Sequence, residues 1–140
     1  MVVAPWRAAY NATKFATEAL ADTLRIEMRG TGIDVILISP GPIASRIRAN
    51  SIPHFERWID WENSPRAAQY HSSLIKRLYE PKTKKDRFEL PASAVTAKLI
   101  RALEDPRPKA RYLVTTPTYA MAILRRILPT RMMDWILSKG

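Results

Sequence analysis

The sequence predicts an α/β fold in which two parallel strands are covered by helices. A long helical pattern leads through a glycine-containing turn into a short apolar strand, and a second β-branched segment follows a later helix. Hydrophobic residues make up 46% and charged residues 26% of the 140-residue chain, a balance typical of globular proteins. A helix that leads into a strand in this way is half of a βαβ unit, from which parallel sheets are built.

The first helix and strand are the clearest predicted elements. Apolar residues recur at steps of three and four, and no proline or glycine interrupts the pattern before Gly30, so a helix is predicted over residues 8–30. Gly30 and Gly32 mark its C-terminal end. The apolar run 33–39 predicts a buried strand that stops at Pro40-Gly41-Pro42.

The rest of the chain is predicted to be mostly helical. A charged segment with a proline predicts a solvent-exposed loop at 80–89, and two further prolines close the helix before the second strand. The expected helices are 45–59, 65–79, 90–104 and 119–137, the last broken at Pro129, and the second strand is 111–116.

The chain is strongly basic, with a formal net charge of +10. Residues 66–87 and 105–140 each contain seven Lys or Arg and two acids, which gives +5 for each stretch. Such stretches attract phosphates, nucleic acid or anionic lipid. A solvated basic surface explains the same pattern more simply, and we expect no nucleic-acid partner.

Several classes of site are excluded or unsupported by the composition. The chain has no cysteine, which excludes disulfides, thiolate metal sites and a cysteine nucleophile. His54 and His71 are too far apart in the sequence to predict a metal site. Residues 1–7 do not resemble a secretory signal, so we expect a cytoplasmic location.

The C-terminal segment 119–137 is apolar but contains three arginines, an aspartate and a proline, which argues against a membrane span. Its basic and aromatic pattern suits peripheral contact with anionic lipid, or a subunit contact. Docking onto the protein's own core explains it equally well.

Tyr10 and Lys14 stand four residues apart in the first predicted helix, so their side chains share one face, one turn apart. A neighbouring ammonium favours the ionised form of a phenol, and such a pair can act as a general acid and base. By itself the spacing is weak evidence, because a packed tyrosine and a solvated lysine on an amphipathic helix give the same pattern.

The surrounding sequence strongly resembles the short-chain dehydrogenase/reductase family over residues 8–47. The shared features are the Tyr-x-x-x-Lys pair among small residues, an acid and an arginine on the helix, the glycine turn, the apolar strand and its final Pro-Gly-Pro-Ile. This resemblance implies the C-terminal part of a Rossmann-like doubly wound parallel sheet. It also implies an NAD- or NADP-dependent oxidoreductase that interconverts an alcohol and a carbonyl, without choosing between the two cofactors.

The resemblance further implies roles for individual residues. The tyrosine that matches Tyr10 transfers a proton to or from the substrate oxygen while hydride moves between the substrate and nicotinamide. The lysine that matches Lys14 assists it and holds the nicotinamide ribose. The other cofactor contacts of the family are a close turn, a backbone contact to the carboxamide and a hydroxyl, which match Pro40 with Gly41, Ile43 and Ser45 respectively.

The chain lacks three features of the family: the glycine-rich phosphate loop, the catalytic serine and the asparagine of the preceding helix. No serine occurs before Ser39. Asn11 does not replace that asparagine, because it is adjacent to Tyr10 and points elsewhere on the helix. We therefore expect Met1 to be a boundary within a longer enzyme, and the 140 residues to be inactive, and poorly folded or oligomeric, by themselves.

We expect one partial domain with three parts: 1–47 with the catalytic helix and strand end, 48–90 as a substrate lid, and 91–140 with the last helix, the last strand and an amphipathic tail. Aromatic residues in 48–90 favour a large apolar substrate, and packing of short helices explains them equally. Family members commonly pair through the helix that matches 8–30, which predicts a homo-oligomer. The alternatives to an enzyme are a non-catalytic dimerisation module and a basic protein at a membrane surface.

Overall fold

The computed structural model describes residues 3–80 and 87–138. Its backbone divides into two compact units, Met1–Ile43 with Phe88–Gly140, and Ala44–Arg87. The first unit holds both strands and the helices that flank them, and the described part of the second unit is helical. The three-part division expected from the sequence stays a prediction.

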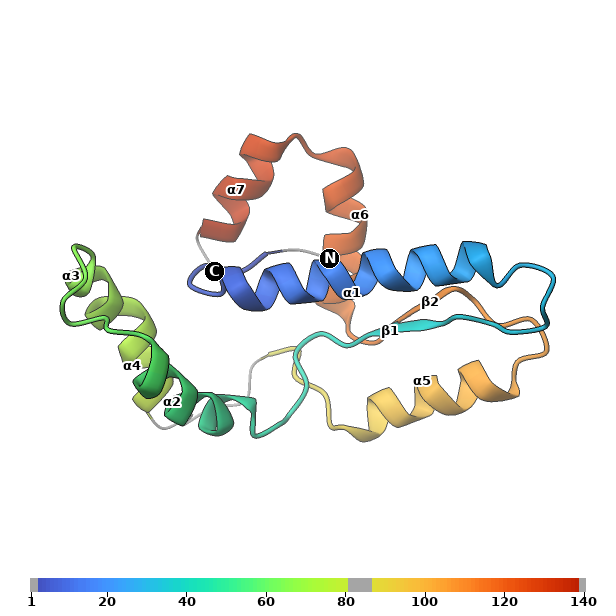
Figure 1. Cartoon of the computed structure of the whole chain (residues 1–140), viewed down its shortest axis with the longest axis horizontal. Helices are drawn as coiled ribbons and strands as arrows, with labels where there is room; N and C mark the ends of the chain where they lie inside the picture. The colour runs from blue at the N-terminus through green and yellow to red at the C-terminus, as the bar shows by residue number, and fades with distance from the viewer. Residues whose placement is uncertain (1–2, 81–86, 139–140) are drawn as a thin grey trace. The chain divides into compact units, whose positions relative to one another are not determined.

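The first unit is built on two short parallel strands with a helix on each side. The strands pair in register from Leu37 with Arg111 to Ser39 with Leu113. Helices α1 and α5 lie on opposite sides of the strand pair (Figure 1). This arrangement confirms the predicted α/β class. The elements are α1 (Ala8–Glu27), β1 (Leu37–Ser39), α5 (Ser93–Glu104) and β2 (Arg111–Leu113).

The predicted end of the first helix lies close to the observed one. α1 ends at Glu27, and the turn that follows contains Gly30 and Gly32 with φ angles of 80° and 78°. Glycine adopts this left-handed conformation without the steric cost that other residues meet. The glycine turn therefore ends the helix and redirects the chain toward β1, as the sequence pattern predicts.

Both strands are shorter than predicted, and β1 is half-buried where the prediction was a buried strand. Residues 33–36 make no ladder, because β2 begins only at Arg111, after a segment with Pro106 and Pro108. Proline has no N–H group to donate to a strand ladder, so the segment that carries Pro106 and Pro108 does not continue the pairing. At the other end, β2 stops at Leu113 because Thr116 already begins the next helix.

The small core of the first unit is centred on β2. Tyr112 lies within that strand and Val114 directly follows it, and both are buried. Ala102 of α5 and Met133 near the C-terminus are the other buried apolar residues of the described chain. Thr115, the second residue after β2, is completely buried although it is polar. The residues that follow β2 are therefore closely packed.

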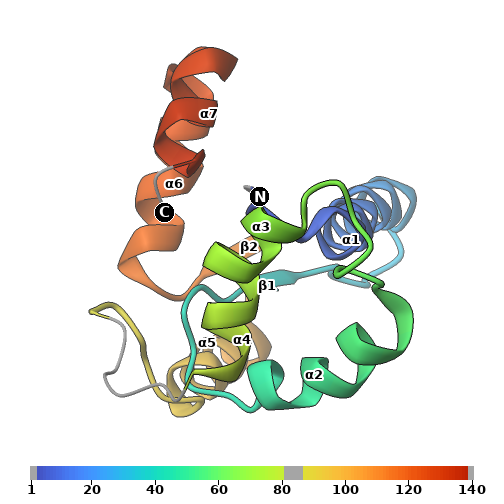
Figure 2. The same cartoon turned by 90° about the vertical axis from the view of Figure 1, so that its left-hand side faces the viewer.

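Two helices follow β2, α6 (Thr116–Ile127) and α7 (Thr130–Ser138). They are separated by Leu128 and Pro129, which confirms the predicted break, since proline within a helix removes a hydrogen bond and clashes with the preceding turn. Helix α7 projects away from the strands (Figure 2). Across residues 3–80 and 87–138, none of the helices has the length and apolar character needed to cross a bilayer.

The second unit consists of α2 (Ile47–Trp58), α3 (Ala67–Gln69), a π-helical turn (Tyr70–Ile75) and α4 (Lys76–Tyr79). The last three are continuous, which confirms a helix near the predicted 65–79. The Tyr79 hydroxyl donates a hydrogen bond of 2.8 Å to the Glu56 carboxylate and ties α4 to α2. Residues 81–86 of the predicted loop lie outside the described chain.

Candidate active site

The first turn of α1 is held by the segment that precedes it. Asn11 is buried, and its side-chain amide donates a hydrogen bond of 2.9 Å to the Ala4 carbonyl. Trp6, between these two residues, has a φ angle of 62°, which is uncommon for a bulky side chain. The chain thus turns sharply just before the helix, and Asn11 secures the turn. Tyr10, its neighbour, is fixed at the beginning of α1.

Tyr10 and Lys14 come together on one face of α1. The Lys14 ammonium nitrogen lies 5.4 Å from the centre of the Tyr10 ring, within the range of a cation–π contact. The Tyr10 side chain is exposed. Within the described chain, neither the Tyr10 hydroxyl nor the Lys14 ammonium makes a hydrogen bond or an ion pair. Both polar groups are therefore open to a ligand.

The turn after β1 passes very close to the residues after β2. A Cβ atom placed on Gly41 would collide with the hydroxyl oxygens of Thr115 and Thr118. These two hydroxyls are themselves 2.8 Å apart and share a hydrogen bond. Glycine is thus required at position 41 by a close approach between two chain segments. Pro40, directly before it, is exposed.

Ile43 continues this turn with a free backbone amide. The Pro42 carbonyl accepts a hydrogen bond of 3.1 Å from the Leu90 amide, which forms an isolated parallel bridge between Ile43 and Leu90. The Ile43 amide and carbonyl take no part in that bond, and neither has a backbone hydrogen-bond partner among the described residues. A polar ligand near the end of β1 could pair with them.

An open hollow of about 1200 Å³ brings most of these groups together. It is lined by residues of α1, of the carboxyl end of β1 and of α6. Of the described lining residues, nine are Lys or Arg and two are acidic, so the hollow favours an anionic ligand. The predicted site residues that line it are Tyr10, Lys14, Pro40 and Gly41.

An ion-pair network ties α1 to β2. The Arg111 guanidinium lies 2.7 Å from the Asp22 carboxylate and 3.2 Å from that of Glu18, and Arg25 lies 2.6 Å from Asp22. The hydrogen bonds from Arg25 and then Arg111 hold the pKa of Asp22 below its usual value. In turn, the hydrogen bond to Asp22 raises the pKa of Arg111 above its usual value. The network fixes α1, and with it Tyr10, against the strands.

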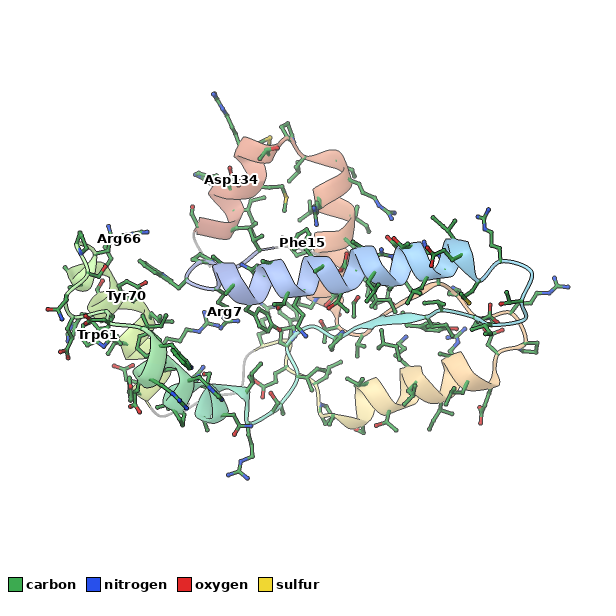
Figure 3. The ribbon with its side chains drawn as sticks, in the orientation of Figure 1. Arg7, Phe15, Trp61, Arg66, Tyr70 and Asp134 are labelled. Carbon is green, nitrogen blue, oxygen red and sulfur yellow. The ribbon has the colours of Figure 1, made fainter. Side chains whose placement is uncertain are left out.

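A second contact positions α1 against α6. The Phe15 ring, one residue after Lys14, points toward α6 (Figure 3). The guanidinium carbon of Arg125 lies 4.8 Å from the centre of this ring. Arginine stacking on an aromatic face is favourable even at partly exposed positions. α6 is thereby held beside the helix that carries the Tyr10 and Lys14 pair.

Two predicted site residues, Ile43 and Ser45, do not line the hollow. Ser45 is exposed, two residues before α2, and belongs to the second unit. Its contact with a cofactor stays a prediction. In the second unit the His71 ring lies 6.4 Å from the Trp61 ring, centre to centre. Among the described residues, no three His, Asp or Glu side chains cluster in a way that could hold a metal ion.

Thr115, Thr118 and Arg111 are not among the site residues predicted from the sequence. The first two line the close approach at Gly41, and Arg111 anchors α1. A pair of threonines three residues apart after a strand is a weak signal, since it is common at the starts of helices. For Arg111, no local pattern indicates that its partners lie 89 and 93 positions earlier.

Comparison with protein-family models gives a match to the short chain dehydrogenase model over residues 1–55. The matched segment includes α1 with Tyr10 and Lys14, the glycine turn, β1 and the Pro-Gly-Pro-Ile turn. It therefore covers all the candidate site residues that were predicted from the sequence.

Comparison with curated proteins extends the similarity over nearly the whole chain. The uncharacterized oxidoreductase YbbO of Escherichia coli (strain K12) is 39% identical over 98% of this chain and 44% of its own length. The NADPH-dependent 3-dehydrocapnine reductase of Ornithobacterium rhinotracheale is 29% identical over 96% of this chain and 45% of its own length. The rat dehydrogenase/reductase SDR family member 7B is 46% identical over 48 residues, 34% of this chain and 15% of its own. The chain thus spans less than half the length of these relatives.

Proposed function

Since the chain belongs to the short-chain dehydrogenase/reductase family, we propose that it carries the acid–base half of an NAD(P)-dependent oxidoreductase that interconverts an alcohol and a carbonyl. The observation that supports this most directly is the geometry of α1. Lys14 places its ammonium 5.4 Å from the Tyr10 ring, and both polar groups are open to a ligand within a basic hollow.

In this proposal Tyr10 moves the proton. Its hydroxyl donates a proton to the substrate oxygen in the reduction direction, and its phenolate oxygen accepts the proton in the oxidation direction. Lys14 provides a positive charge one helical turn away, which stabilises negative charge on the phenol oxygen as the proton leaves. Asn11 and Arg111 keep the pair in place, because they fix the start and the middle of α1.

The described residues fit the nicotinamide end of a dinucleotide cofactor, which when bound would exchange hydride with the substrate carbon. Lys14 would hold the ribose hydroxyls, and the Ile43 amide is open to a carboxamide oxygen. Gly41 already touches Thr115, so Pro40 and Gly41 form a fixed turn beside the hollow. The excess of cations around the hollow suits the negative charge of the cofactor. We further propose that Ser45 contributes its hydroxyl.

We also propose that the substrate is large and apolar. Trp58 of the second unit is 68% exposed, so packing within that unit leaves much of its ring available to a ligand. Within the first unit, the exposed side chains of Tyr119 and Ile123 from α6 line the hollow. Exposed aromatic and aliphatic side chains of this kind favour a mostly hydrocarbon substrate with one reacting oxygen.

Self-association through α1 is a further proposal. Leu20 and Ile26 of this helix are each 61% exposed, so α1 offers large aliphatic side chains that a partner could cover. A second copy could cover these residues in a homo-oligomer. Sedimentation velocity of the protein and of a Leu20→Ser variant tests this: a lower average mass for the variant supports the proposal, and an unchanged one contradicts it.

The test of the enzymatic proposal combines cofactor binding with turnover. The oxidoreductase in which this chain would supply the acid–base half is titrated with NADH and NADPH, and oxidation of each is followed with medium- and long-chain aldehydes and ketones. We expect Tyr10→Phe to lower kcat roughly a hundred- to ten-thousandfold while cofactor binding stays largely intact. Lys14→Met should weaken both binding and turnover, because both depend on its charge.

Tyr79→Phe is the matched control, since Tyr79 is a similarly exposed tyrosine outside α1. This variant should leave the turnover of a short-chain aldehyde unchanged. Equal losses in Tyr10→Phe and Tyr79→Phe, or turnover that survives Tyr10→Phe, would contradict the assigned role of Tyr10.

A further inference from the structure

The corner between α6 and α7 carries large apolar side chains on its surface. Ile127 at the end of α6 is 71% exposed, and Met132 and Trp135 in the first turns of α7 are 51% and 61% exposed. Met132 and Trp135 are three residues apart, so they share one face of α7. We call these three residues the corner surface. Because α7 projects away from the strands (Figure 2), this surface lies at an edge of its unit.

Two arginines flank the corner surface. Arg126 directly precedes Ile127, Arg131 directly precedes Met132, and both side chains belong to exposed residues. Neither arginine has a carboxylate within ion-pair distance among the described residues. Asp134 is the one acid in the sequence of α6 and α7. The corner therefore combines exposed apolar groups with a net positive charge.

We propose that the corner surface docks on an anionic phospholipid membrane. Ile127, Met132 and Trp135 would enter the boundary between head groups and acyl chains, while Arg126 and Arg131 pair with lipid phosphates. Arginine and tryptophan suit this position, because each has an apolar body and a polar end. This proposal does not rest on the enzymatic function, although Arg126 also lines the hollow.

The charge of the corner argues for lipid over two other occupants. A second copy docked symmetrically on the same surface would bring Arg126 and Arg131 close to their own equivalents, and like charges oppose such a contact. Nucleic acid would match the arginines but would leave the aliphatic Ile127 and Met132 without a partner. An anionic bilayer satisfies both kinds of side chain at once.

The test is sedimentation of the whole protein with lipid vesicles. One set contains phosphatidylcholine, and in the other about a third of the lipid is phosphatidylglycerol, which gives the vesicles a negative surface potential. We expect binding to the anionic vesicles only, and weaker binding as salt is raised. Arg126→Gln with Arg131→Gln should lower the partition coefficient about thirtyfold, since each arginine near an anionic surface contributes about fivefold.

Matched controls separate the corner from general charge and hydrophobicity. Trp135→Ser should lower binding severalfold, and Trp58→Ser, at a tryptophan of similar exposure beside another arginine, should not. Arg29→Gln with Arg107→Gln removes two exposed arginines elsewhere and should reduce binding much less than the corner pair. All the altered residues are exposed, and circular dichroism of each variant verifies that it folds.

Four outcomes would overturn the proposal. The first two are a failure to bind anionic vesicles and equal binding to both vesicle types. The third is an equal effect of the corner and control variants on binding. The fourth is self-association, measured by sedimentation velocity, that Ile127→Ser abolishes. The last would assign the corner surface to a second copy of the chain.

Discussion

Arg111 on β2 holds Asp22 on α1 through a hydrogen-bonded ion pair of 2.7 Å, although the two residues are 89 positions apart. Arg25 binds the same carboxylate from within the helix. The carboxylate of Asp22 thus joins the helix that carries the Tyr10 and Lys14 pair to the strand next to the hollow. Such a link should be sensitive to acid.

The stability of the protein should depend on pH through Asp22. Its pKa is lowered in the folded state, so the ionised carboxylate adds stability above the unfolded-state pKa of about 4, and this stability is lost as the pH falls through the lower, folded-state pKa. In the Asp22→Asn variant, the urea concentration at the midpoint of unfolding should therefore fall less steeply as the pH is lowered below about 4. Asp34→Asn, at an exposed aspartate, is the control. Identical pH profiles for the two variants would contradict the prediction.

Gly41→Ala should destabilise the protein by about 1–3 kcal/mol, because the added methyl group meets the hydroxyls of Thr115 and Thr118. The comparison is with Gly32, where a Cβ has open space around it and only the positive φ angle matters. Asparagine tolerates that angle, so Gly32→Asn should lower the free energy of unfolding only a little. Gly41→Asn should lower it more than Gly41→Ala does. Chemical denaturation measures all three. A nearly neutral Gly41→Ala would show that the two segments separate easily.

Asn11→Asp should lower the free energy of unfolding by about 1–3 kcal/mol, since the amide donor to the Ala4 carbonyl is replaced by an acceptor in a buried position. Because the same contact holds the first turn of α1, hydrogen exchange of the amides near Tyr10 should also accelerate. Asn50→Asp, at an exposed position of α2, serves as the control. Unchanged exchange in Asn11→Asp would mean that the helix start does not depend on this bond.

Tyr79 should ionise at higher pH than an ordinary phenol. The hydrogen bond to the Glu56 carboxylate is the main cause that raises the pKa of Tyr79. The contact therefore stabilises the second unit below the unfolded-state pKa of about 10, and this contribution is lost as the pH rises through the folded-state value. The ultraviolet titration of the wild type minus that of Tyr79→Phe isolates this phenol. Glu56→Gln should shift the difference curve to lower pH, while Glu62→Gln should leave it in place.

Much of the local structure could be predicted from the sequence. The apolar period of three and four indicated α1, two glycines indicated its end, and Pro129 indicated the break between α6 and α7. The Tyr10 and Lys14 pair also follows from local geometry, since residues four apart on a helix must share a face. The strand lengths were predicted wrongly, because a strand extends only as far as its partner, and the partner of residues 33–39 begins late.

The sequence by itself determined the helices, their ends, the α/β class and the face on which Tyr10 and Lys14 meet, because these depend on residues only a few positions apart. Only the tertiary structure decided that Thr115 closes on Gly41, that Arg111 reaches Asp22 and that Phe15 meets Arg125. Each of these contacts joins segments that are distant along the chain. Their geometry depends on how strands and helices pack, which no local period of the sequence records.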